Sequence, residues 1–121
     1  MKILIVDDEE HIREMVGEYL ESEGHQVLLA VNGKDGLETA RREAGALDLI
    51  ILDNKMPVMS GLDMLRKLRA ESDNVSVLIA TGHSELDEKS ASEFGVLGVL
   101  EKPFSLNQIK NFMQQKYSKG K

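Results

Sequence analysis

Five apolar runs alternate with five helix-like stretches along the chain. Most of the runs are continuously apolar, which is typical of strands that are buried on both faces. The stretches between them carry apolar side chains at the three- and four-residue spacing of an amphipathic helix. The predicted strands are Lys2–Val6, Gln26–Ala30, Asp48–Leu52, Val75–Ala80 and Leu97–Leu100, and the predicted helices are Glu9–Glu23, Gly33–Glu43, Gly61–Glu71, Ser84–Phe94 and Ser105–Tyr117.

Short connections between these elements predict how the strands are arranged. Strands and helices that alternate in this way form a parallel sheet, because each strand is joined to the next by a right-handed helical crossover. We therefore expect an α/β domain with a doubly wound, five-stranded parallel sheet and helices on both faces. This domain spans residues 1–117, and residues 118–121 are a tail or a truncation point.

Composition narrows the class of protein. The 121 residues have the length of one domain, and they include no cysteine for disulfides or thiolate metal sites. The net charge of −6 argues against nucleic acid as a direct partner, because phosphate binding requires a positive surface. The N-terminal apolar run is too short for a signal peptide, and a membrane span needs about 20 apolar residues. We therefore expect a soluble, cytoplasmic protein without a membrane partner.

Polar side chains follow four of the predicted strands at the point where each strand ends. Each has an ordinary explanation when taken alone, such as a helix N-cap, but their joint occurrence favours a site. The carboxyl ends of parallel strands meet at one edge of a sheet, where ligands bind. Three carboxylates, a hydroxyl and an ammonium would suit a divalent cation beside a phosphoryl group. These residues are Asp7, Asp8, Asp53, Thr81 and Lys102.

The clustered carboxylates indicate a particular chemistry. Close carboxylates repel one another, so their pKa values should rise in the absence of a cation. Magnesium is a hard ion that prefers oxygen ligands, and it suits such a cluster. An aspartate can also act as a nucleophile and form an acyl phosphate. Lys102 and the Thr81 hydroxyl would then contact phosphoryl oxygens, and Gly82 would leave room for the incoming group and offer its backbone N–H.

Four segments of the chain match one known family. With these segments the chain resembles the receiver domains of two-component response regulators over nearly all of its length. The resemblance implies a flavodoxin-like fold and a phosphorylation-controlled signalling switch. The matching segments are Ile5-Val6-Asp7-Asp8-Glu9, Asp53-Asn54-Lys55-Met56-Pro57-Val58-Met59-Ser60-Gly61, Thr81-Gly82 and Lys102-Pro103-Phe104.

The resemblance also implies a donor and an acceptor. Asp53 would accept the phosphoryl group from a phosphohistidine on a sensor histidine kinase or a histidine phosphotransfer protein. The backbone at Asn54 and Gly82 would bind phosphoryl oxygens, and the Lys102–Pro103 peptide bond would be cis. The protein would be no enzyme in the usual sense, because it would only phosphorylate and dephosphorylate itself.

By the same resemblance, Mg²⁺, or Mn²⁺ in its place, would be the cofactor. Asp8, Asp53 and the backbone carbonyl of Lys55 would hold this ion, and Asp7 would act mostly through coordinated water. The positions two residues after the acceptor and two after the threonine flank the path of hydrolytic water. Lys55 and His83 occupy these positions and would tune the lifetime of the phosphoryl group.

One position departs from the family pattern. Receivers often carry an aromatic residue midway through the last strand, as a rotamer switch coupled to the threonine hydroxyl. Val99 stands there in this chain. Movement of Thr81 on phosphorylation survives this change, but the aromatic half of the switch does not.

A docking patch for the donor is predicted on the first helix and after the last strand. That helix carries more apolar residues than one buried stripe needs. We expect Ile12 and Met15 to dock a helical bundle that bears the donor histidine, with Pro103 and Phe104 completing the patch. Burial of these residues in the ordinary core is the alternative.

Other functions remain as alternatives. A single-domain regulator or phosphorelay intermediate is favoured, because the chain ends soon after the last helix. The rivals are the N-terminal receiver of a longer regulator with a DNA-binding or enzymatic output domain, and a non-phosphorylated pseudo-receiver. A haloacid-dehalogenase-type phosphatase would need an aspartate where Lys55 stands. A flavodoxin or a dinucleotide-binding domain would need a phosphate loop where Asp7 and Asp8 stand.

Overall fold

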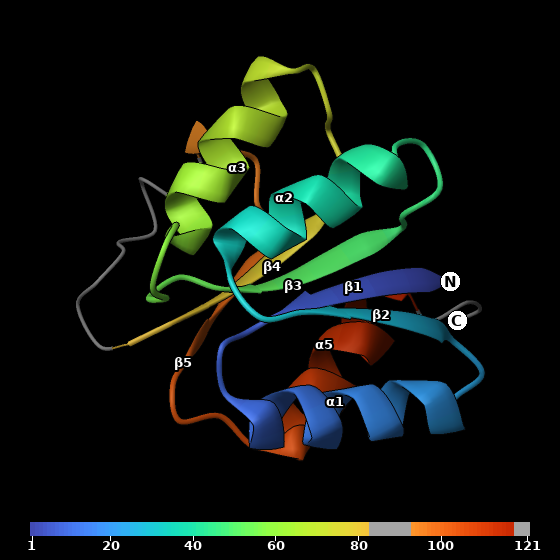
Figure 1. Cartoon of the computed structure of the whole chain (residues 1–121). Coiled ribbons are helices and arrows are strands. Elements are labelled where there is room, and N and C mark those ends of the chain that lie inside the picture. Colours follow the sequence, from blue (N-terminus) through green and yellow to red (C-terminus); the bar gives the residue numbers. More distant parts are fainter. Residues whose placement is uncertain (83–92, 118–121) are drawn as a thin grey trace.

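Five parallel strands form the central layer of the molecule. The structure, a computed structural model, describes residues 1–82 and 93–117. The strand order is β2-β1-β3-β4-β5, so the chain runs outward from β1 in one direction and then from β3 in the other (Figure 1). This is the doubly wound sheet that the sequence predicts. The strands are β1 (Lys2–Val6), β2 (Gln26–Ala30), β3 (Leu49–Asp53), β4 (Val77–Thr81) and β5 (Gly98–Glu101).

Four helices in the described part of the chain cover both faces of the sheet (Figure 1). Successive side chains of a strand point to opposite faces, so β1, β2, β3 and β4 each contribute to two separate apolar clusters. One cluster joins the sheet to α2 and α3, and the other joins it to α1 and α5. None of the described helices has the length and hydropathy needed to cross a bilayer. The helices are α1 (Glu10–Ser22), α2 (Gly33–Arg42), α3 (Gly61–Ala70) and α5 (Leu106–Tyr117).

Local sequence signals explain where these helices begin and end. The Asn32 side chain accepts a hydrogen bond from the Asp35 N–H at 2.8 Å and caps α2. Ser105, just before α5, and Gln108, in its first turn, exchange side-chain to backbone hydrogen bonds, which form a capping box. Gly24 follows α1 with φ of +91°, a left-handed conformation that costs glycine little.

Several predicted boundaries differ from the observed ones. β3 and β4 were expected to end before Asp53 and Thr81, but both residues belong to their strands. The reason is tertiary, because Asp53 stays in register with Ala80, and Thr81 with Glu101. β1 and β2 have their predicted bounds, and the other described elements shift by one residue at one or both ends. The predicted helix 84–94 falls mainly on residues 83–92, outside the described residues.

A glycine at the start of α3 brings that helix close to the end of β3. A Cβ atom added at Gly61 would lie 2.3 Å from the Asp53 carbonyl oxygen and 2.9 Å from the Asn54 Cα. These neighbours are backbone atoms that cannot rotate away. By contrast, a Cβ atom at Gly17 in α1 would meet only side-chain atoms at 3.8 Å, which is an ordinary contact.

Alanine substitutions at the two glycines should therefore have opposite effects on stability. Gly61→Ala should lower the free energy of unfolding by about 2 kcal/mol or more, because overpacking forces the backbone apart. Gly17→Ala should raise it by up to about 1 kcal/mol, because alanine is the better helix former. Urea unfolding followed by circular dichroism measures both changes. Equal stability of the two variants would contradict the close approach of α3 to β3.

Candidate functional site

The described polar side chains predicted at the strand ends gather at one edge of the sheet. Asp7 directly follows β1, Asp53 ends β3 and Thr81 ends β4, and each is only 3% exposed. β1 and β3 are neighbours, and the chain winds in opposite directions from them, so the crevice lies at the point where strand order reverses. Asp8 is exposed beside this crevice, and Lys102 reaches it from the residue after β5.

The Lys102 ammonium contacts three carboxylates at once. Its Nζ atom lies 3.2 Å from Asp7 Oδ2, 3.3 Å from Asp53 Oδ1 and 2.9 Å from Glu9 Oε1. The Lys102 backbone N–H also donates to the Thr81 carbonyl at 2.8 Å, which ties the lysine to the end of β4. The following peptide bond, Lys102–Pro103, is cis, as predicted. Glu9 was not among the predicted site residues, although it directly follows the predicted pair of aspartates.

Burial shifts the pKa of the two inner carboxyl groups. Burial, together with the charge of Asp7, raises the pKa of Asp53 from 3.8 to about 7, and the attraction of Lys102 offsets only part of this rise. Burial also raises the pKa of Asp7, although the hydrogen bond from the Glu9 N–H and the charge of Lys102 both act to lower it. The predicted rise is confirmed for both groups, but burial contributes more to it than repulsion between the carboxylates.

The same contacts keep Lys102 charged. Burial opposes its charge, but the hydrogen bond to Glu9 and the charges of Asp7 and Asp53 outweigh burial, so the Lys102 pKa is raised. In return, the hydrogen bond and charge of Lys102 lower the pKa of Glu9. Lys102 therefore remains an ammonium over the whole physiological pH range.

Backbone hydrogen bonds fix the loop that follows Asp53. The Asn54 N–H donates to the Ala80 carbonyl at 2.8 Å, and the Asn54 carbonyl accepts from the Gly61 N–H at 2.8 Å. The Asn54 side chain accepts from the Leu62 N–H at 3.0 Å. The Asn54 N–H, which was expected to bind a phosphoryl oxygen, is thus already paired within the sheet. It would have to leave Ala80 to make that contact.

The carboxylate cluster fits a divalent cation. Asp7, Asp8 and Asp53 each offer one oxygen atom, and these atoms lie within 4.8 Å of one another. Oxygen donors of this kind, two buried and one exposed, suit a hard ion such as Mg²⁺ that keeps part of its water. The raised pKa of Asp53 also identifies a buried negative charge that a cation would stabilise.

The other predicted site residues are spread around the crevice. Lys55 is exposed, Gly82 is half-buried, and His83 lies outside the described residues. Val99, at the usual aromatic switch position, is 37% exposed on β5. Of the four predicted docking residues, Pro103 is exposed, whereas Ile12, Met15 and Phe104 are partly buried against the cluster under α1 and α5.

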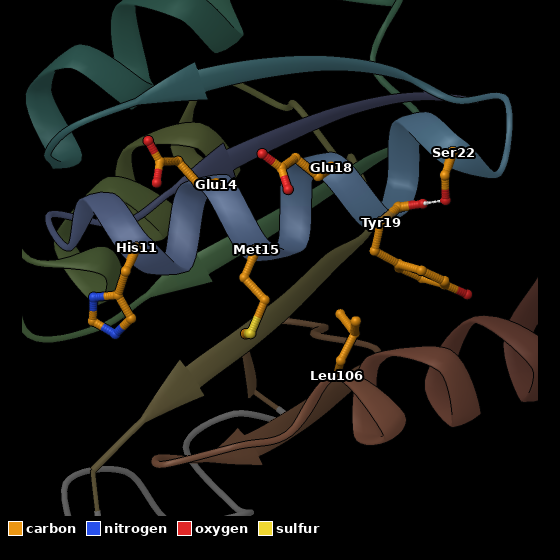
Figure 2. Close-up of a pocket in the computed structure, with 7 residues that line it drawn as sticks. All are labelled: His11, Glu14, Met15, Glu18, Tyr19, Ser22 and Leu106. Carbon is orange, nitrogen blue, oxygen red and sulfur yellow. Dashed lines mark hydrogen bonds between the residues drawn. The ribbon is translucent and has the colours of Figure 1, made fainter.

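A groove of about 560 Å³ runs between α1 and the start of α5 (Figure 2). Figure 2 shows Met15 and Tyr19 of α1 on the side of the helix that faces Leu106 of α5, whereas Glu14 and Glu18, which also line the groove, extend from the other side of the helix. Met15 is thus the one predicted docking residue among the described residues that line it. The pattern of α1 alone could not reveal Leu106, because that residue comes from a distant segment.

Comparisons with known proteins agree with this arrangement. The family model described as "Response regulator receiver domain" matches residues 3–114. Sporulation initiation phosphotransferase F of Bacillus subtilis is 36% identical over 115 residues, which cover 94% of this chain and 91% of that protein. The probable transcriptional regulatory protein TcrX of Mycobacterium tuberculosis is 36% identical over 108 residues, which cover 88% of this chain but only 45% of that protein.

Solved structures share the fold. A response regulator receiver domain protein from Clostridium thermocellum superposes with a TM-score of 0.83 at 33% identity, covering 94% of this chain and 91% of that one. The response regulator TrrA of Thermotoga maritima, solved in complex with Mg(2+)-BeF, superposes with a TM-score of 0.79 at 31% identity, covering 94% and 96%. From the family match and these likenesses, the chain belongs to the response regulator receiver domain family.

Proposed function

We propose that this receiver domain accepts a phosphoryl group on Asp53, in a Mg²⁺-dependent reaction, from a phosphohistidine on a sensor histidine kinase or a histidine phosphotransfer protein. The proposal rests on one observation, the Lys102 ammonium 3.3 Å from the Asp53 carboxylate in a pocket shared with Asp7 and Asp8. A fixed positive charge at this point stabilises the charge of an incoming phosphoryl group. The protein turns over no substrate other than its own phosphoaspartate.

The transfer itself needs little beyond positioning. An Asp53 oxygen forms a bond to phosphorus while the P–N bond to the donor imidazole breaks. The electron pair stays on the imidazole nitrogen, which takes a proton. Lys102 binds one phosphoryl oxygen, and the Thr81 hydroxyl, which lies 3.4 Å from the Gly82 carbonyl before transfer, turns to donate to another. Gly82 offers its N–H without a side chain in the way, and Asn54 contributes its N–H only after that group leaves the sheet.

Asp8, Asp53 and the Lys55 carbonyl would hold Mg²⁺, with Asp7 acting mostly through water, and the bound ion supplies charge neutralisation at the phosphoryl oxygens. Mn²⁺ is a second candidate, because it also accepts carboxylate and carbonyl ligands. The complex of the similar TrrA protein with Mg(2+)-BeF supports this assignment. Lys55, together with His83, would then set how fast water reaches the phosphoryl group.

The relatives support a proposal for the place of the domain in its pathway. A phosphorelay intermediate or single-domain regulator is favoured, because the chain spans 91% of the sporulation phosphotransferase. The second candidate is the receiver of a transcriptional regulator, because the chain spans just under half of several such relatives. In either case Val99 stands where receivers often carry an aromatic switch residue. Phosphorylation would therefore alter partner binding through the movement of Thr81 alone.

Docking of the donor is proposed at α1 and the segment after β5, through Ile12, Met15, Pro103 and Phe104. The groove between Met15 and Leu106 extends this patch, because its apolar floor can receive side chains of a partner helix (Figure 2). Glu14 and Glu18, which also line the groove, favour a partner surface with basic residues beside the apolar ones.

Incubation with acetyl phosphate and Mg²⁺ should add one phosphoryl mass to the wild-type protein. Asp53→Ala should show no gain, because it lacks the nucleophile, and omission of Mg²⁺ should abolish the gain in wild type. Asp63→Asn, which alters an exposed carboxylate in α3, should keep it. Intact-mass spectrometry measures all four cases. A full gain in Asp53→Ala would refute the acceptor assignment.

The stability of the metal-free protein should depend on the protonation of Asp53. Its pKa is raised to about 7, so the folded state binds this proton more tightly than the unfolded chain does. Stability should therefore fall as pH rises from about 4 to 7, by an amount on the order of 3 kcal/mol. Asp53→Asn lacks this titration, so wild type should lose stability relative to the variant between pH 5 and pH 8.

Urea unfolding of both proteins at the two pH values measures this difference. Mg²⁺ should restore the stability of wild type at pH 8 and have little effect at pH 5, where the proton competes with the ion. A constant difference between wild type and Asp53→Asn across this range would contradict the raised pKa.

The docking patch predicts that its substitution slows phosphotransfer from a protein donor but not from a small-molecule donor. Met15→Ala should slow phosphotransfer from a phosphorylated histidine kinase several-fold, because it removes apolar contact with the donor, and should leave phosphorylation by acetyl phosphate unchanged. Leu29→Ala, a truncation of an exposed apolar residue on β2, is the matched control and should change neither rate. Equal slowing of Met15→Ala with both donors would show that the residue serves the fold and not docking.

A further inference from the structure

Glu9 stands at the N-cap of α1 but does not cap the helix. Its backbone is extended there, and its side chain makes no capping hydrogen bond. Helices usually begin with Ser, Thr, Asp or Asn, whose short side chains reach the first free N–H groups. The Glu9 carboxylate instead points to Lys102, with Oε1 at 2.9 Å from Nζ. Its position is therefore explained by the lysine and not by the helix.

An ammonium has three N–H donors, and three carboxylates surround that of Lys102: Glu9 accepts a hydrogen bond, and Asp7 and Asp53 form ion pairs with it. Glu9 is the nearest of the three, at 2.9 Å against 3.2 Å for Asp7 and 3.3 Å for Asp53. A phosphoryl oxygen that arrives on Asp53 needs one of these donors. Lys102 can supply it only if one of the present contacts is given up.

The three carboxylates differ in how easily they can release the lysine. The side chains of Asp7 and Asp53 are 4% and 3% exposed, so neither can replace the ammonium with water. The Glu9 side chain is 46% exposed, so water can take over its hydrogen bond at once. Glu9 is therefore the contact that gives way when a phosphoryl group binds.

We propose that Glu9 is a positioning residue that holds Lys102 at the rim of the crevice and competes with the phosphoryl group for its ammonium. This inference rests on the proposed function of Asp53. Glu9 would restrain both the rate at which Asp53 is phosphorylated and the affinity of the site for a phosphoryl-like anion. Because an exposed ion pair is a weak interaction, its removal should change either quantity by roughly three- to fivefold.

Glu9→Gln tests this competition, because glutamine keeps the length of the side chain and removes its charge. Glu10→Gln is the matched control. Glu10 is the next residue and is exposed in the first turn of α1. Its substitution by glutamine removes the same charge from the neighbourhood of the crevice. Each protein is compared at a Mg²⁺ concentration that saturates it, so that a change in metal affinity does not enter the result.

Two measurements apply to each protein. The first is the rate of phosphorylation by acetyl phosphate, in which an Asp53 oxygen bonds to phosphorus, the P–O bond to acetate breaks, and acetate leaves with the electron pair. The second is a titration with beryllium fluoride, followed by ¹⁹F NMR, which reports affinity without any reaction. Glu9→Gln should be faster and bind more tightly by the stated factor, and Glu10→Gln should stay close to wild type.

The outcomes separate this inference from the function on which it rests. If wild type is phosphorylated but the rate and affinity change equally in the two variants, Glu9 acts only through long-range electrostatics. The competition for Lys102 is then refuted. A slower or weaker-binding Glu9→Gln would show that Glu9 assists Lys102, and would also refute it. If wild type itself gains no phosphoryl group on Asp53, the proposed function fails first.

Discussion

The charge of one lysine holds the crevice together. Asp7 and Asp53 are both buried, and two charges about 4 Å apart repel by roughly 4 kcal/mol at an effective dielectric constant of 20. Lys102 lies between them and compensates part of this repulsion, but one positive charge cannot balance two buried carboxylates and Glu9 as well. The unliganded crevice is therefore left with excess negative charge, which is the physical reason for proposing that a cation accompanies the phosphoryl group.

This imbalance is tolerated because the surrounding structure is closely packed. The strands beneath the crevice are buried on both faces, and α2 and α3 use glycines to approach these strands and the loop that follows β3. A Cβ atom at Gly33 would lie 2.4 Å from the Met59 carbonyl oxygen, and one at Gly36 would lie 2.9 Å from Val6. Together with Gly61, these positions let α2 and α3 pack closely against the structure beneath the crevice.

The sequence predicted the strands and the edge on which the site lies, because buried parallel strands are continuously apolar and polar residues follow them. It predicted the ends of β1 and β2 but not those of β3 and β4, because the register of neighbouring strands extends β3 to Asp53 and β4 to Thr81. It also missed the contact between Glu9 and Lys102, since the two residues are 93 positions apart and an exposed glutamate has no preferred partner in the pattern. Residue roles that came from resemblance to receivers stay predictions.

The hydrogen bond from the Asn54 N–H to the Ala80 carbonyl has a consequence for signalling. It joins the residue after the acceptor to the residue before Thr81, so the ends of β3 and β4 are linked through main-chain atoms. If the Asn54 N–H leaves Ala80 to bind a phosphoryl oxygen, as proposed, this link breaks, and the change at Asp53 reaches the end of β4 through the backbone. A receiver with Val99 in place of an aromatic residue would therefore keep a main-chain route from the crevice to the neighbouring strand.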